Sequence, residues 1–162
     1  MAPGYGTVDH GMPIIDAHRI IRRLYQGSLP PAGPWLRHAG FDVLVLAARE
    51  LQPSASRFPG LVVYHVPLED DPGPLTSQER RVIRRVSRLL AAHHRAGKRV
   101  LITCAAGWNR SGIITAATLR RITGAPHDAI VDRIRRKRSP RALGNRDFVR
   151  AFKQQHLGSV GY

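Results

Sequence analysis

Short apolar runs alternate with amphipathic stretches along most of the chain. Residues 41–47, 61–66 and 100–103 are almost continuously apolar, which is typical of strands covered on both faces of a sheet. A shorter strand is predicted at residues 24–26. Elsewhere, apolar residues recur at helical spacing. The predicted helices lie near residues 35–38, 76–96, 111–123, 126–138 and 145–156. Strands that alternate with helices predict an α/β fold with a central, mostly parallel sheet of about four to five strands, flanked by helices.

The clearest helix signal follows a proline-rich segment. Residues 67–74 contain three prolines and are predicted to form a loop. Directly after it, Thr76 and Glu79 have the spacing of a capping box, in which each side chain accepts a hydrogen bond from the backbone N–H of the other residue. Gly97 is placed to end this helix, and Gly124 to end the helix that begins near residue 111.

Length and composition indicate one folded domain. A chain of 162 residues, of which 43% are hydrophobic, has enough apolar material for one sizeable core, which excludes a disordered tail or a coiled-coil rod. Residues 1–13 contain three glycines and two prolines, and we expect residues 1–20 to form a loose arm. Residues 21–157 are then the single domain, and residues 158–162 form a short tail.

Charge and cysteine content narrow the choice of partners and compartment. The chain has 26 Lys and Arg against 11 Asp and Glu, and a formal net charge of +15 attracts anionic substrates. The single cysteine excludes an intramolecular disulfide and any multi-cysteine metal site, so we expect a reducing, cytoplasmic environment. No apolar run approaches the roughly 18 residues that a membrane span needs, and we expect none.

One predicted strand leads directly into a loop suited to phosphate chemistry. Cys104 follows the strand, Arg110 lies six positions later, Gly107 lies between them, and a helix begins near Ser111. Backbone N–H groups converge where a loop joins a helix N-terminus, and they bind anions there. Such donors and a guanidinium favour the thiolate form of a cysteine, which is a strong nucleophile. A planar guanidinium also holds two phosphate oxygens at once. The segment predicts a phosphate cradle with Cys104 at its base.

Other readings of this loop fit less well. An isolated cysteine at a strand end is often an inert core residue, but here it is followed by glycine, arginine, serine and glycine before a helix. A Walker A loop needs lysine after its second glycine, where this chain has Ile113. The three spaced glycines of a dinucleotide-binding turn are absent.

The sequence of residues 100–112, VLITCAAGWNRSG, resembles the signature loop of the cysteine-dependent protein tyrosine phosphatases, and it is most similar to the compact dual-specificity branch. Residues 24–28 resemble the opening strand and turn of this branch, and residues 138–148 resemble its closing helical region. The resemblance covers roughly residues 24–153. One position departs from the pattern, because Thr103 stands where the family usually has histidine.

The resemblance implies a role for each functional group of the loop. Cys104 would attack phosphorus and form a phosphocysteine, Arg110 would bind the equatorial phosphate oxygens, and Ser111 would help the sulfur to leave. No metal or cofactor is implied. The substrate-binding cradle would consist of Ala105, Ala106, Gly107, Trp108, Asn109 and Arg110.

Release of an alcohol or a phenol from phosphorus needs a proton donor. The acidic run of the chain is formed by Glu69, Asp70 and Asp71, inside the proline-bounded loop. In the family that this loop resembles, the general acid lies three residues after a proline that follows a strand. Asp70 has this spacing from Pro67. Asp70 is therefore predicted to be the general acid, with Asp71 as the alternative. We expect Glu69 to be a surface residue that pairs with arginine.

A basic cluster follows the predicted site. We interpret most of its members as a solvated helix face that raises the local concentration of phosphorylated or polyanionic substrates. Non-specific contact with nucleic acid is a further possibility. The cluster consists of Arg133, Arg135, Arg136, Lys137, Arg138 and Arg141.

These observations lead to one principal functional hypothesis. By its resemblance, the chain is expected to be a protein phosphatase that hydrolyses phosphotyrosine, and phosphoserine or phosphothreonine as well, with a phosphorylated protein as its partner. Some RNA 5′-triphosphatases of the same superfamily have Gly-x-Asn-Arg in the loop, as residues 107–110 do here. An RNA 5′-triphosphatase or other polyanion phosphatase is thus one alternative. A phosphate-binding module without turnover is another.

Overall fold

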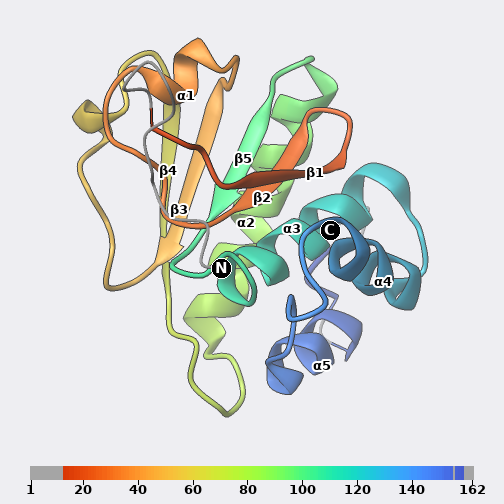
Figure 1. Ribbon diagram of the computed structural model, residues 1–162. Coiled ribbons are helices and arrows are strands. Elements are labelled where there is room, and N and C mark those ends of the chain that lie inside the picture. The colour runs from red at the N-terminus through yellow and green to blue at the C-terminus, as the bar shows by residue number, and fades with distance from the viewer. Residues whose placement is uncertain (1–12, 155, 159–162) are drawn as a thin grey trace.

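A computed structural model describes residues 13–154 and 156–158. Its centre is a five-stranded sheet in the order β1-β2-β5-β3-β4 (Figure 1). The first pair, β1 and β2, is antiparallel, and the other three pairs are parallel. The expected mostly parallel sheet of four to five strands is thereby confirmed. The strands are β1 (Ala17–Ile21), β2 (Leu24–Gly27), β3 (Val43–Ala48), β4 (Val62–Leu68) and β5 (Val100–Thr103).

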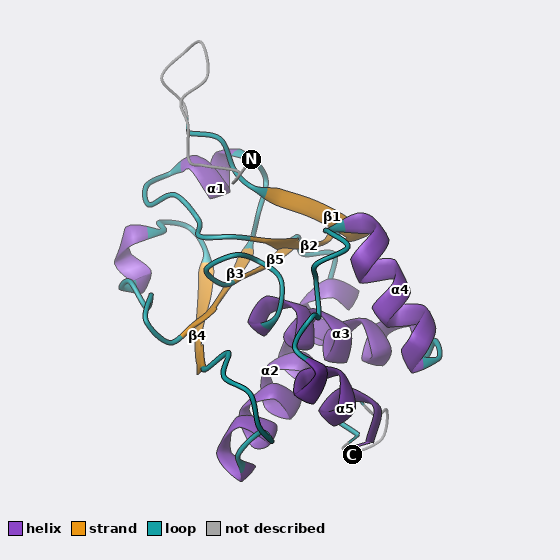
Figure 2. Cartoon of the chain, turned by 60° about the horizontal axis from the view of Figure 1, so that its bottom comes forward, coloured by secondary structure: helices purple, strands orange, loops and turns teal. Residues whose placement is uncertain are grey.

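Helices cover both faces of the sheet (Figure 2). The short helix α1 lies on one side, and the four longer helices lie on the other. Each predicted helix is present, with bounds that differ by a few residues at most. The helices are α1 (Trp35–His38), α2 (Ser77–Arg95), α3 (Arg110–Thr123), α4 (His127–Lys137) and α5 (Arg146–Gln154), and a single 3-10 turn spans Ala55–Arg57.

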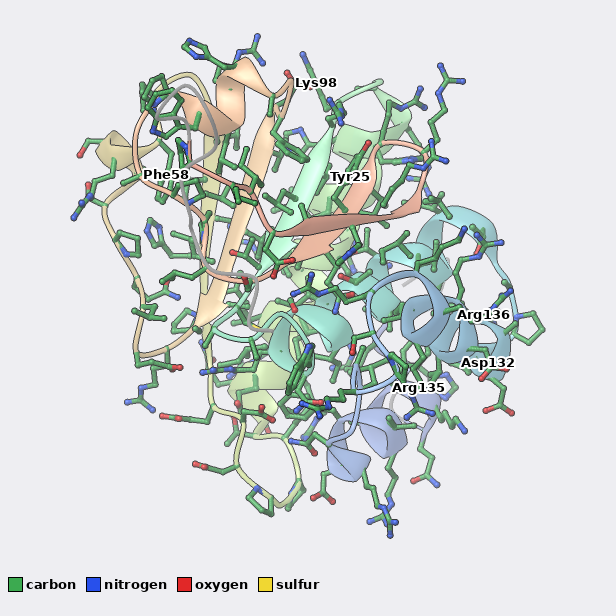
Figure 3. The ribbon with its side chains drawn as sticks, viewed as in Figure 1. Tyr25, Phe58, Lys98, Asp132, Arg135 and Arg136 are labelled. Carbon is green, nitrogen blue, oxygen red and sulfur yellow. The ribbon has the colours of Figure 1, made fainter. Side chains whose placement is uncertain are left out.

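The interior strand β3 is apolar throughout because it separates two hydrophobic layers. Side chains of a strand alternate between the two faces of the sheet. Val43 and Val45 pack in the larger core with the long helices. Leu44 and Leu46 pack on the opposite face, in a smaller core that includes Phe58. Figure 3 shows Phe58 at the α1 side of the molecule. All six residues of β3 are buried, as the continuous apolar run predicts.

Strand β4 differs from the expectation that it is covered on both faces. It is the last strand of the sheet, paired only with β3, and Val62 is 46% exposed. It also runs through Pro67 to Leu68 instead of ending before the proline. Proline lacks the N–H that a central strand needs, and an edge strand tolerates it because one side of the strand is unpaired.

The expectation of a loose arm over residues 1–20 is wrong for residues 17–20, which belong to β1. Residues 1–12 lie outside the described part of the chain, whereas residues 17–21 form β1 and pair with β2. The strand was not recognised because its sequence, AHRII, has no continuous apolar run. At the other end, Gly158 is buried, and a Cβ atom there would lie 2.5 Å from the carbonyl oxygen of Ala117 on α3. Residues 159–162 of the expected tail lie outside the described residues.

Helix α2 begins as the sequence predicts. The Thr76 hydroxyl accepts a hydrogen bond from the backbone N–H of Glu79 at 3.0 Å, and the Glu79 carboxylate accepts one from the backbone N–H of Thr76 at 2.9 Å. Both arms of the capping box are therefore formed. None of the described helices combines the length and the apolar character needed to cross a membrane.

Replacing Thr76 by alanine should lower the free energy of unfolding by about 1 kcal/mol, because one N-terminal N–H of α2 loses its acceptor. Urea denaturation measures this loss. Thr76→Ser is the matched control, since it keeps the hydroxyl and should unfold close to the wild-type midpoint. Equal midpoints for the alanine and serine variants would show that the cap contributes nothing.

Candidate active site

The candidate site lies where β5 ends and α3 begins. Cys104 is the first residue after β5, and the chain turns through the loop 104–109 into α3. Gly107 makes this turn possible with a positive φ of 77°. A Cβ atom at this position would lie 2.4 Å from the Arg138 guanidinium and 2.6 Å from the carbonyl group of Gly27. Only glycine fits there, because both the backbone angle and the space exclude a side chain.

The sulfur of Cys104 faces the inside of this loop. The residue is 5% exposed. Its Sγ atom is 3.2 Å from the hydroxyl oxygen of Ser111, in a hydrogen bond, and accepts a hydrogen bond from the backbone N–H of Gly107 at 3.3 Å. When the thiol ionises, the Ser111 hydroxyl can turn its proton toward the sulfur. The loop thus offers two donors to a thiolate, which suits a nucleophile.

Arg110 is buried beside the cysteine and held by an acidic residue. Its two terminal nitrogens donate to the Glu50 carboxylate at 2.5 and 2.7 Å, and one of them also donates to the Leu68 carbonyl at 3.2 Å. The hydrogen bonds that Arg110 donates to Glu50 raise the pKa of Arg110 further, and the guanidinium lowers the pKa of Glu50 to about 2. The Arg110 Nε atom is buried and has no partner among the described residues. An anion in the loop would supply that partner.

Glu50 was not among the residues predicted from the sequence to belong to the site. A usable signal exists, because Glu50 follows β3 by two residues and the carboxyl ends of parallel strands meet at one edge of the sheet. Cys104 follows β5, the neighbour of β3, at the same edge. An acidic residue after the neighbouring strand is therefore well placed to meet a loop arginine.

Asp70 reaches the loop from the proline-bounded segment. Its two carboxylate oxygens accept hydrogen bonds from the side-chain amides of Asn109 at 3.0 Å and Asn145 at 2.9 Å. The carboxylate of Asp147 accepts a further bond from the backbone N–H of Gly73 at 2.8 Å. Together with neighbouring residues, Asp70, Asn109 and Asn145 line an open hollow at the surface. The chain segment after β4 is thus tied both to the loop and to the start of α5.

The other two acidic residues of this run lie at the exposed surface. Glu69 forms an exposed ion pair with Arg49 at 3.0 Å, in agreement with its expected surface role. Asp71 is exposed as well. Asp70 is the member of the run whose carboxylate contacts the loop that carries Cys104, through Asn109.

Two side chains of the β5–loop segment have partners outside the loop. The Thr103 hydroxyl donates a hydrogen bond to the Val45 carbonyl at 2.7 Å and so links β5 to β3. Thr103 stands where the family that the loop resembles usually has histidine. The half-buried Trp108 stacks with Arg141, whose guanidinium carbon lies 5.4 Å from the ring centroid.

The basic cluster is only partly a solvated face. Arg138 is buried and pairs with Asp16, with 3% of each side chain exposed. Arg135 donates to the carbonyls of Ala142 and Leu143 at 3.1 and 2.9 Å. Arg136 is exposed, and Figure 3 shows it with Arg135 on α4, at the opposite side of the molecule from Phe58. Arg138 and Arg135 therefore bind backbone carbonyls or a buried carboxylate instead of facing solvent. The number of charges in the sequence does not distinguish these two roles.

Within residues 13–154 and 156–158, no three His, Cys, Asp or Glu side chains come together as a metal site would require. The hydrogen-bonding groups of the candidate site are instead the thiol, the hydroxyl, the guanidinium and the backbone N–H groups of one loop, which are suited to binding an oxyanion.

Comparison with known proteins gives matches among solved structures. No protein-family model matches the chain, and no curated protein sequence matches it. A mouse protein described as a dual specificity phosphatase, in complex with zinc tungstate, has a TM-score of 0.73 and 26% identity over 94% of each chain. Tk-PTP in its active form has a TM-score of 0.72 and 26% identity, over 87% of this chain and 96% of its own. Human DUSP28 has a TM-score of 0.71 and 25% identity, over 86% and 93%.

These similarities agree with the architecture. The matched proteins cover most of this chain and most of their own length, so the whole described fold is shared rather than one motif. The mixed five-stranded sheet with helices on both faces, and the strand–loop–helix that carries Cys104, are the features that the sequence resemblance implies. The chain is thus similar in its whole described fold to compact dual-specificity phosphatases, which supports a cysteine phosphatase of that compact kind.

Proposed function

We propose that this chain is a phosphatase that hydrolyses phosphoproteins, phosphotyrosine above all, through a phosphocysteine intermediate. The observation that carries the proposal is the buried Nε donor of Arg110, which has no partner among the described residues and belongs to the same loop as the Cys104 sulfur. A buried donor without an acceptor is costly. A phosphate oxygen bound in the loop would satisfy this donor.

In the first step, the Cys104 thiolate attacks phosphorus. A sulfur–phosphorus bond forms while the bond from phosphorus to the leaving oxygen breaks. Asp70 donates a proton to that oxygen, so the product departs as a neutral alcohol or phenol. The inward backbone N–H groups and Arg110 hold the phosphate oxygens, whose negative charge is concentrated on the equatorial positions at the transition state.

In the second step, water attacks the phosphocysteine. Asp70, now a carboxylate, takes a proton from the water, the sulfur–phosphorus bond breaks, and inorganic phosphate is formed. The Ser111 hydroxyl lies 3.2 Å from the sulfur and stabilises the departing thiolate by donating a hydrogen bond. The free enzyme is restored with Cys104 as a thiolate and with Asp70 protonated by the attacking water, ready to donate that proton in the next cycle.

The substrate preference follows from the resemblance and from the names of the matched proteins, which are dual-specificity or tyrosine phosphatases. Phosphoserine and phosphothreonine are accepted beside phosphotyrosine. No comparison favours an RNA 5′-triphosphatase or a nucleic acid partner, and two arginines of the basic cluster are engaged in internal contacts.

Replacing Cys104 by serine should reduce hydrolysis of a generic aryl phosphate on the order of a thousandfold or more, because a serine hydroxyl is a far weaker nucleophile than a thiolate. Release of the phenol is followed by absorbance, and a thermal melt checks that the variant is folded. Equal rates for the variant and the wild type would exclude the phosphocysteine.

Replacing Asp70 by asparagine should have an effect that depends on the leaving group. With phenyl phosphate, a poor leaving group that needs protonation, kcat should fall about a hundredfold or more. With a dinitrophenyl phosphate, whose phenolate leaves unaided, the loss should stay below about tenfold. Asp71→Asn is the matched control and should resemble the wild type on both substrates. The reverse pattern between the two variants would transfer the role to Asp71.

The Arg110–Glu50 pair should make stability depend on pH in a defined window. Glu50 has its pKa lowered from the ordinary 4.5 to about 2. A lowered carboxyl pKa contributes stability that is fully present above about pH 4.5 and is lost as the pH falls towards 2. The difference in unfolding free energy between the wild type and Glu50→Gln should therefore shrink below about pH 4.5.

Urea titrations between neutral pH and pH 3 measure this difference. Glu69→Gln is the matched control, since Glu69 pairs with Arg49 at the exposed surface, where ion pairs contribute little. Its difference from the wild type should stay small throughout. A Glu50→Gln difference that does not vary with pH would mean that the pair does not stabilise the fold.

A further inference from the structure

Arg138, which follows α4, binds the outer side of the loop 104–109. The planar guanidinium of an arginine carries five N–H donors, and all five have acceptors here. Two nitrogens bind the Asp16 carboxylate at 2.7 Å each, and one of them also lies 2.8 Å from the His18 Nδ1 atom. The remaining two donors bind the carbonyl oxygens of Ala106 and Gly107 at 3.0 Å each.

These two carbonyls belong to the loop that holds the Cys104 sulfur. In a planar trans peptide, the C=O and N–H bonds point in opposite directions. The carbonyl of Ala106 points out to Arg138, and the N–H of the same peptide, on Gly107, points in and donates to the Cys104 sulfur at 3.3 Å. One peptide group thus connects the guanidinium on the outside with the sulfur on the inside.

The next peptide follows the same pattern. The Gly107 carbonyl accepts from both Arg138 and the side-chain amide of Gln26, each at 3.0 Å, so both of its lone pairs are used on the outer side. The N–H of this peptide, on Trp108, therefore points away from Arg138. Hydrogen bonding to a charged donor also polarises each peptide, which strengthens its N–H as a donor.

Asp16 keeps this arginine in place and neutralises its charge. Burial raises the pKa of the Asp16 carboxyl, but the hydrogen bonds from Arg138 and Ser28 outweigh burial and leave the pKa below its ordinary value. The carboxylate is therefore ionised at neutral pH, and it compensates a guanidinium that is equally buried. Among the described residues, the hydrogen-bond partners of the sulfur are Ser111 and Gly107, so any effect of Asp16 or Arg138 on the sulfur passes through the peptides.

We propose that Arg138, held by Asp16, is a positioning residue for the active-site loop: it fixes the peptides at 106–107 and 107–108 with their N–H groups inward, and so promotes the reactivity of Cys104 and the binding of an oxyanion. The role of Arg138 in turnover rests on the proposed function. The effect of Arg138 on the thiol is independent of that function, because it concerns a hydrogen bond to the sulfur that is present without substrate.

The test uses Arg138→Lys in the full chain. Lysine keeps the positive charge beside Asp16, but it offers three donors on one nitrogen in place of the five donors that the guanidinium spreads over Asp16, His18 and both carbonyls. We expect the midpoint of pH-dependent alkylation of Cys104 by iodoacetamide to rise by about one pH unit, as loss of one donor to a thiolate implies. We also expect kcat on an aryl phosphate to fall about tenfold and KM to increase, because the same N–H groups bind phosphate.

Arg136→Lys is the matched control. Arg136 lies two residues earlier and is exposed on α4, so its variant should alkylate and turn over like the wild type (Figure 3). A second variant, Asp16→Asn, keeps the shape of the side chain and leaves Arg138 less firmly oriented, and should move the alkylation midpoint in the same direction. If a thermal melt shows that Arg138→Lys does not fold, the Asp16→Asn variant takes its place in the test.

A purely structural role would lower the melting temperature and leave the alkylation midpoint unchanged. An unchanged midpoint in a folded Arg138→Lys or Asp16→Asn variant overturns the inference, even if the wild type is an active phosphatase. An inactive wild type overturns the proposed function instead, and the comparison of alkylation midpoints still decides the role of Arg138.

Discussion

A peptide group cannot present its N–H and its carbonyl to the same side, and the active-site loop is organised around that constraint. If the N–H groups of residues 105–110 face a bound anion, the carbonyls of those peptides face the protein interior, where each needs a donor. Ala106 and Gly107 find theirs in Arg138 and Gln26. The Trp108 carbonyl accepts from the backbone N–H of Leu143 at 3.0 Å. The inner face of the loop is thus supported by hydrogen bonds to the carbonyls on its outer side.

Those donors come from distant parts of the chain, so the loop ties together segments that are far apart in the sequence. Gln26 lies on β2, Arg138 follows α4, and the carboxylate that holds Arg138 immediately precedes β1. Each of the two arginines at the site has its own acidic partner, Glu50 for Arg110 and Asp16 for Arg138. Although the chain as a whole is strongly basic, the charges of these two arginines are locally matched.

The fold was largely predictable from the sequence because its elements are marked locally: apolar runs for the central strands, a capping box for α2 and glycines at helix ends. The loop was predictable because its residues are consecutive. Glu50 and Arg138 were not, since their partners are 60 and 122 residues away in the sequence. Arginine is usually solvated, and only the three-dimensional arrangement distinguishes the buried Arg138 from its exposed neighbour Arg136. The strand β1 was missed because an edge strand shows no continuous apolar pattern.

Pro67 in the edge strand β4 has a consequence for how copies of the protein meet. An unpaired strand edge invites another strand to add to the sheet, which leads to dimers or aggregates. Pro67 offers no N–H for such pairing, and the ladder between β3 and β4 is already irregular near this point, between Leu46 and Ala48. The proline that leads into the segment of Asp70 therefore also discourages the sheet from growing into a neighbouring molecule.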